Sequence, residues 1–106
     1  MTNPEGKTAA VVAYITIIGS LIAISMNSEP KHEFARFHTR QAFGLHLVFH
    51  GLGLFLSTIY LDSARAFFYF VFFGVWVYAF SIVLLNKQIE LPLLGSYFQK
   101  WFTFIP

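Results

Sequence analysis

The sequence predicts an all-α integral membrane protein, a bundle of three transmembrane helices that forms a single membrane domain over residues 1–106. Three observations predict this class. The chain is 57% hydrophobic and only 11% charged, and 20% of its residues are aromatic. It also contains three long runs without any Asp, Glu, Lys or Arg. A soluble domain of this size has too small an interior to hide so much apolar surface from water.

The three runs are residues 9–26, 42–61 and 66–85. Each is close to the ~20 residues that a helix needs to cross a hydrocarbon core of about 30 Å. Backbone groups in lipid must hydrogen-bond within their own segment, so each run is expected to be one helix. The short connection 62–65 predicts a tight antiparallel hairpin, with Asp62 or Ser63 capping the third helix.

Two further segments are expected at the membrane surface. Ser28-Glu29-Pro30 is a helix-start signal. It predicts an amphipathic cytoplasmic extension over residues 30–41 that continues into the second span, with Gly44 as its weakest point. Residues 92–106 are broken by Pro92 and Gly95 and rich in aromatic side chains, which is typical of an interfacial segment.

The distribution of Lys and Arg predicts the orientation. With three spans, the N-terminal segment and connection 62–65 share one side and carry Lys7 and Arg65. The other side carries five basic residues, namely Lys31, Arg36, Arg40, Lys87 and Lys100. Because basic residues favour the cytoplasmic side, we expect the N-terminus outside and the C-terminus in the cytoplasm.

The extension before the second span carries the first group of candidate site residues: Phe34, Arg36, Phe37, His38, Arg40 and Gln41. On a helix, the two arginines share a face and the aromatic residues lie opposite. Contact of these residues with lipid headgroups is the simpler expectation, because long basic side chains reach the phosphates from apolar surroundings. The alternative is that Arg36, His38 and Gln41 form a polar network with other segments or bind a partner.

A second group forms a polar stripe along the second span: Thr39, His46, His50, Gly53 and Ser57, at spacings typical of one helix face. Such a stripe is costly against hydrocarbon, so it is predicted to be buried against helices or a water-filled cavity. The expected partners are Thr16 and the small-residue seam of the first span, and Tyr78 and Ser81 of the third.

The chain shows no pattern of an enzyme. The pair His46 and His50 could bind a metal, but no Asp or Glu lies at that depth and the chain has no cysteine. We therefore expect no catalysis, no metal and no cofactor. No phosphate loop or nucleic-acid signature is present, and no small-molecule substrate is indicated. Two alternatives stay open: an oligomeric transporter or channel lined by the stripe, and a subunit that binds haem or a metal.

The segment FARFHTRQA, residues 34–42, resembles the F-x-R-F-H-x-x-Q-A/S signature of a large bacterial family of small uncharacterised multi-span membrane proteins. That family is similar to the Tic-type protein-import channel component of the chloroplast inner envelope. The matching residues are Phe34, Arg36, Phe37, His38, Gln41 and Ala42, and a P-x-x-G element follows at Pro92 to Gly95. The plant proteins differ in having four spans and a transit peptide.

The resemblance implies a bacterial inner-membrane location and a link to protein import or translocation. Together with the composition, it predicts a non-enzymatic accessory or structural subunit. Its expected partners are membrane lipid and either other membrane subunits or further copies of the chain.

Overall fold

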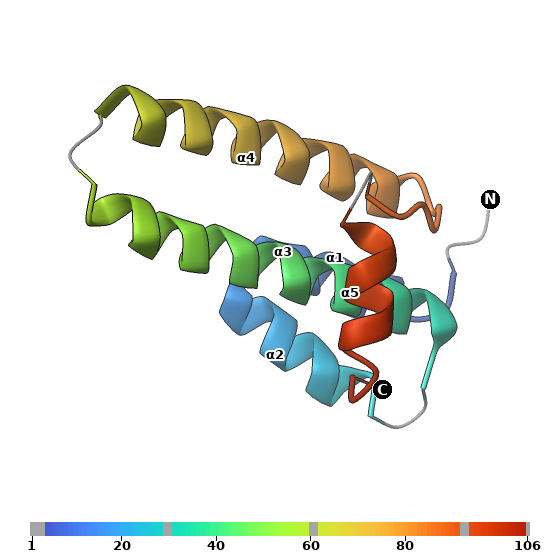
Figure 1. Cartoon of the computed structure of the whole chain (residues 1–106). Helices are drawn as coiled ribbons and strands as arrows, with labels where there is room; N and C mark the ends of the chain where they lie inside the picture. Colours follow the sequence, from blue (N-terminus) through green and yellow to red (C-terminus); the bar gives the residue numbers. More distant parts are fainter. Residues whose placement is uncertain (1–3, 29–30, 60–61, 92–93, 106) are drawn as a thin grey trace.

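The computed structural model describes residues 4–28, 31–59, 62–91 and 94–105 (Figure 1). These residues form five helices and no strand, so the all-α prediction is confirmed for the part described. The helices are α1 (Lys7–Ile15), α2 (Ile17–Met26), α3 (Glu33–Ser57), α4 (Asp62–Leu84) and α5 (Gly95–Trp101). Helices α3 and α4 run antiparallel, α1 and α2 pack on the N-terminal half of α3, and α5 crosses that half (Figure 1).

The first predicted span is two short helices. The backbone of Thr16 is extended, with φ −148° and ψ 171°, and its hydroxyl accepts a hydrogen bond of 3.0 Å from the N–H of Gly19, which caps α2. Helix α1 has 9 residues and α2 has 10. At 1.5 Å per residue each is about 15 Å long, roughly half the core of a bilayer. The prediction of one spanning helix over residues 9–26 is therefore wrong.

Small residues explain why α2 turns back along α1 (Figure 1). The Ser20 hydroxyl donates to the carbonyl oxygen of Ala13 over 2.7 Å. At Gly19, a Cβ atom would lie 2.2 Å from the carbonyl oxygen of Val12, so no larger residue fits there. The small-residue seam thus closes a helical hairpin within residues 7–26, whereas the sequence had suggested docking onto a separate helix.

Helix α3 joins the predicted extension and second span in one continuous helix of 25 residues. It begins at Glu33; Glu29 and Pro30 of the helix-start signal lie outside the described residues. The Asn27 side chain bonds both the N–H of His32, at 2.8 Å, and its carbonyl oxygen, at 3.2 Å, which fixes the connection from α2. Gly44 is a docking position for α5, because a Cβ atom there would lie 2.4 Å from the ring of Phe98.

Helix α4 is the one helix within the described ranges that is long and apolar enough to cross a membrane. Helix α2 is apolar but short, and α3 carries Arg36 and Arg40 in its first half. The fold therefore does not contain the three equivalent transmembrane helices that the sequence predicted.

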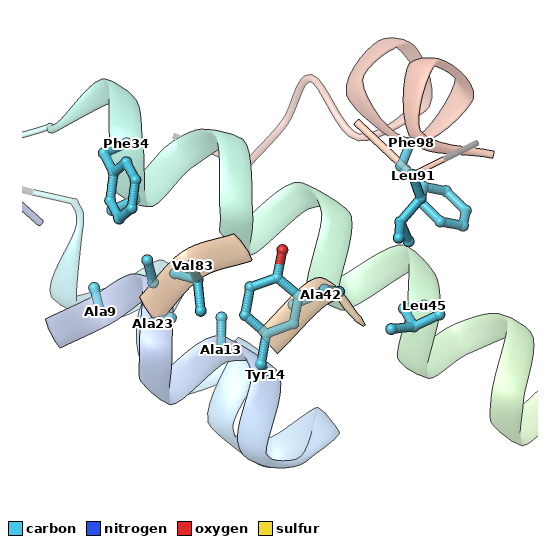
Figure 2. Packing of buried hydrophobic residues seen from close by; sticks show 13 residues of the cluster. Ala9, Ala13, Tyr14, Ala23, Phe34, Ala42, Leu45, Val83, Leu91 and Phe98 are labelled. Atoms are coloured by element: carbon cyan, nitrogen blue, oxygen red, sulfur yellow. The ribbon is translucent and has the colours of Figure 1, made fainter. Parts of the chain in front are cut away.

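The packed core lies where α1 and α2 meet the first half of α3 (Figure 2). It brings together α1, α2, the first half of α3 and the last turns of α4. Leu91, which precedes α5, and Phe98 within α5 also belong to it. Beyond this core, aromatic rings of α3 and α4 pack together. Phe49 stacks on Phe68 with ring centres 5.9 Å apart and contacts Phe72 at 5.6 Å.

Many large apolar side chains are exposed on the outer surface. On α4, Phe67 is 71% exposed and Phe70 is 79% exposed. Leu54 of α3 and Ile18 of α2 are likewise turned outward. The C-terminal segment follows the same pattern: Trp101 and Phe104 are exposed, whereas Phe98 is buried. Pro92 of the P-x-x-G element lies outside the described residues.

The hairpin changes the distribution of charge. The ammonium group of Lys7 donates to the carbonyl oxygen of Leu84 over 3.1 Å, at the C-terminal end of α4. Arg65 lies at the opposite end of α4, where it pairs with Asp62. Lys7 and Arg65, expected on one side of the membrane, therefore lie at opposite ends of α4, because α1 enters and α2 returns at the same end. Of the seven Lys and Arg residues, all except Arg65 belong to this basic end.

Candidate functional site

A chain of hydrogen bonds links Tyr14, His38 and Gln41 in the core. The Tyr14 hydroxyl lies 2.7 Å from Nδ1 of His38, and Nε2 of Gln41 donates to the same hydroxyl over 3.0 Å. Nε2 of His38 lies 2.6 Å from the carbonyl oxygen of Lys87. Oε1 of Gln41 accepts from the N–H of Leu91 over 2.8 Å. Figure 2 shows the Tyr14 ring in the middle of the cluster with its hydroxyl aimed at α3.

These contacts determine where the protons are. A carbonyl oxygen only accepts, so Nε2 of His38 carries the hydrogen that Lys87 receives. Nδ1 is then the acceptor for the Tyr14 hydroxyl, which in turn accepts from Gln41. Each hydrogen bond has one donor and one acceptor when His38 is neutral.

Burial favours the same neutral form of His38. It lowers the pKa of His38 to about 4, against a smaller opposing effect of the hydrogen bond to Lys87. The imidazole is also surrounded by ring edges, with Phe34 at 4.7 Å and Phe37 at 5.1 Å between centroids. His38 therefore acts here as a neutral bridge between α1, α3 and the segment after α4.

The motif residues thus divide into an inner and an outer set. Phe34, His38 and Gln41 are buried, so they cannot contact lipid headgroups in this fold. His38 and Gln41 form hydrogen bonds with residues 87–91. Such bonds belong to a polar network with another segment, which was the second interpretation of these motif residues. Phe37 and Arg36 are half-buried.

Arg40 holds the C-terminal segment rather than projecting into a headgroup layer. Its guanidinium donates to the carbonyl oxygen of Ile105 over 3.0 Å and to that of Thr103 over 3.3 Å. Partial burial, and then the nearby charge of Arg36, lower the pKa of Arg40 from its usual value. Since that usual value is far above neutral, the guanidinium stays charged. Of the two arginines, Arg36 is the better placed for a headgroup.

A second polar site surrounds the break between α1 and α2. The last carbonyl groups of a helix have no partner within it, which is costly away from water. Here side chains supply the partners. Nε2 of His46 donates to the carbonyl oxygen of Ala13 over 3.1 Å, and the indole N–H of Trp76 donates to that of Tyr14 over 2.6 Å. With Ser20, three side chains cap the end of α1.

A groove opens beside this break. Its volume is about 470 Å³, and α2, α3 and α4 all contribute to its walls. Most lining residues are aliphatic or aromatic, among them Leu45, Phe49 and Phe72. His46, His50 and Thr16 are the polar lining residues at the middle of α3 and at the break.

The predicted stripe is buried only along its first part. Thr39 and His46 are buried, Gly53 is half-buried, and His50 and Ser57 are exposed. The physical reason is the length of the hairpin, because α1 and α2 cover α3 only as far as His46. Within the described residues, the Thr39 hydroxyl has no hydrogen-bond partner. Tyr78 and Ser81, the partners expected from the third span, are exposed.

Within the described ranges, no three His, Cys, Asp or Glu side chains come together as metal ligands would. His46 already donates through Nε2 to Ala13, and His50 lies on the rim of the groove. The two histidines therefore lack the further protein ligands that a closed metal site needs.

Sequence reasoning missed Tyr14 and Trp76, the residues that connect α1 to α3 and α4. Both lie inside apolar runs, where an aromatic residue indicates a lipid-facing or interfacial position. The available signal was the position of Tyr14 directly after Ala9, Ala10 and Ala13, a row of small residues that allows close packing. Its hydroxyl then needs a buried partner.

No family model, no curated protein and no solved structure matches this chain. The resemblance at residues 34–42 therefore has no support beyond those residues themselves.

Proposed function

We propose that this chain is a non-enzymatic membrane protein, a small structural subunit that lies in a bilayer with α4 across it. One observation carries the proposal. Only 17% of the most apolar stretch of α4 is buried inside the molecule, whereas the apolar core helix of a soluble protein is mostly buried. Such an exposed apolar surface on a monomer indicates a lipid or protein partner.

The length of α4 fits a bilayer. Helix α4 has 23 residues, which correspond to about 35 Å. Asp62 and Arg65 mark one end of α4, and Lys87 follows its other end. Between them α4 carries no charge, so a hydrocarbon layer of about 30 Å fits between the two ends.

The hairpin α1–α2 fits the same arrangement as a re-entrant element. Backbone that leaves the helix at membrane depth is tolerated only where protein or water satisfies its polar groups. Ser20, His46 and Trp76 satisfy the carbonyl groups at this break. The hairpin enters from the basic end and returns to it.

The orientation follows from the basic residues. Six of the seven Lys and Arg residues belong to the basic end, and Arg65 alone lies at the other. The positive-inside rule then puts the basic end in the cytoplasm, with both Lys7 and α5 on that side. This replaces the orientation in which the N-terminus is outside. Lipid and other membrane subunits, or further copies of the chain, are the proposed partners of the exposed α4 face.

Single cysteines test the proposal without interference, because the chain contains none. We expect Thr8→Cys, Ser28→Cys and Ser96→Cys to react with a membrane-impermeant maleimide from one side of sealed vesicles, and Ser63→Cys only from the other side. Extraction of the protein by carbonate would contradict a membrane location. Labelling of Thr8→Cys and Ser63→Cys from the same side would support three full spans instead.

A further inference from the structure

The groove beside the helix break has a polar atom without a partner at its wall. His46 is 8% exposed and donates through Nε2 to Ala13, so its Nδ1 carries a lone pair. Among the described residues, no hydrogen bond reaches this Nδ1. Because His46 lines the groove, this lone pair is an acceptor in largely apolar surroundings.

Donors lie at the same wall. The first N–H groups of a helix have no partner within it. In α2, Thr16 caps the N–H of Gly19, and the N–H groups of Ile17 and Ile18 have no hydrogen bond within the described residues. Ile17, Ile18 and Thr16 all line the groove. An acceptor and donors thus line one space whose remaining walls are mostly aliphatic and aromatic, with His50 on the exposed rim.

We propose that this groove binds an apolar molecule that carries a neutral hydroxyl group, with the hydroxyl bonded to Nδ1 of His46. A hydroxyl both donates to the imidazole and accepts from the N–H groups of α2. A ketone or ester cannot donate to Nδ1. A carboxylate or an ammonium group would find no Lys, Arg, Asp or Glu among the lining residues and would be buried without a counter-charge.

The size of the groove fits such a ligand. Small-molecule sites are mostly apolar cavities of roughly 300–1,000 Å³ with a few placed polar groups, and this groove has about 470 Å³. All lining residues belong to this chain, so the groove needs no partner subunit to form. Binding of a ligand there is a function beyond the proposed structural role, and it does not depend on the orientation of the chain in the membrane.

The chain contains two tryptophans, and Trp76 lines the groove. In a Trp101→Phe background, Trp76 fluorescence reports occupancy of the groove by a brominated probe. We expect 11-bromo-1-undecanol to quench it saturably in detergent, with an apparent affinity about tenfold higher than that of 1-bromoundecane, because one hydrogen bond is gained. Equal quenching by the two probes would overturn the proposal.

Two variants distinguish the role of His46 in binding from that of His50. His46→Phe is expected to remove the preference for the alcohol, whereas His50→Phe, on the exposed rim, is expected to retain it. Loss of the preference in both, or in neither, would contradict the role of His46.

Because His46→Phe also removes the bond to Ala13, a second measurement needs no substitution. The ¹⁵N resonance of Nδ1 of His46 should shift on addition of 1-undecanol and not of undecane, while that of Nε2 stays in place. Identical spectra with both additions would show that no ligand hydroxyl bonds to Nδ1 and would overturn the proposal.

Discussion

The Tyr14 hydroxyl lies 2.7 Å from Nδ1 of His38, and this contact joins the first helix to the third across the core. The same oxygen accepts from Gln41. One phenol thus satisfies two buried polar side chains of the motif at residues 34–42. Its removal is the most direct test of the network.

Tyr14→Phe is expected to lower the free energy of unfolding by about 1–3 kcal/mol, because it leaves Nδ1 of His38 and Nε2 of Gln41 without their partner. Denaturation in detergent micelles, followed by circular dichroism, measures the change. Tyr78→Phe removes an exposed hydroxyl on α4 and is the matched control, expected to change stability by less than about 0.5 kcal/mol. Similar losses in both variants would mean that the buried network adds nothing.

The neutral state of His38 predicts a dependence of stability on pH. Its pKa falls from 6.5 in the unfolded chain to about 4 in the fold. Between these values the unfolded chain binds a proton that the folded chain does not, so stability falls as pH falls. This group's contribution is complete above pH 6.5 and decreases by at most about 1.4 kcal/mol per pH unit down to pH 4.

His38→Gln removes the titrating group and provides the comparison. The difference in unfolding free energy between the original chain and His38→Gln should shrink between pH 7.5 and pH 4.5. The effect of carboxylate titration on stability is common to both proteins and cancels in that difference. A difference that stays constant over this range would show that His38 is protonated in the fold or already exposed.

Gly19→Ala is expected to open the hairpin. The added Cβ would lie 2.2 Å from the carbonyl oxygen of Val12, and backbone on both helices would have to move. We expect a loss of about 1–3 kcal/mol, typical of overpacking. Gly74→Ala on α4 is the control, because nothing lies within 4 Å of its added methyl group. Equal stability of the two variants would mean that α1 and α2 lie further apart than this contact requires.

Arg40 and Arg36 are predicted to behave differently although they are one helical turn apart. Arg40→Ala removes the hydrogen bonds to Thr103 and Ile105 and should release the C-terminal segment to proteolysis after Lys100. Arg36→Ala leaves those bonds in place and is the matched control, expected to leave cleavage after Lys100 unchanged. Increased cleavage in Arg36→Ala alone would reverse these assignments.

The long helices could be predicted from the sequence, and the break could not. A continuous apolar run defines α4, and the helical pattern after Glu33 defines α3. At Thr16, by contrast, neither proline nor glycine occupies the break itself. The break is stable because side chains from distant positions, His46 and Trp76, donate to the carbonyl groups of α1. Tertiary contacts of this kind override the local preference for one helix.

The candidate site shows the same limit. Helical periodicity correctly grouped Phe34, His38 and Gln41 on one face, yet it could not tell whether that face meets lipid or protein. Spacing placed His50 and Ser57 in line with His46, but burial along that line depends on where α1 and α2 end. The spacing therefore placed these residues along one line of α3, but only the first part of that line is buried.

The caps of α1 also constrain the order in which the chain can mature during synthesis. Trp76 lies 62 positions after the carbonyl that it satisfies, and His46 lies 33 positions after its own. Synthesis proceeds from the N-terminus, so α1 is made before either donor. The caps of α1 are therefore complete only after α3 and α4 have packed against it.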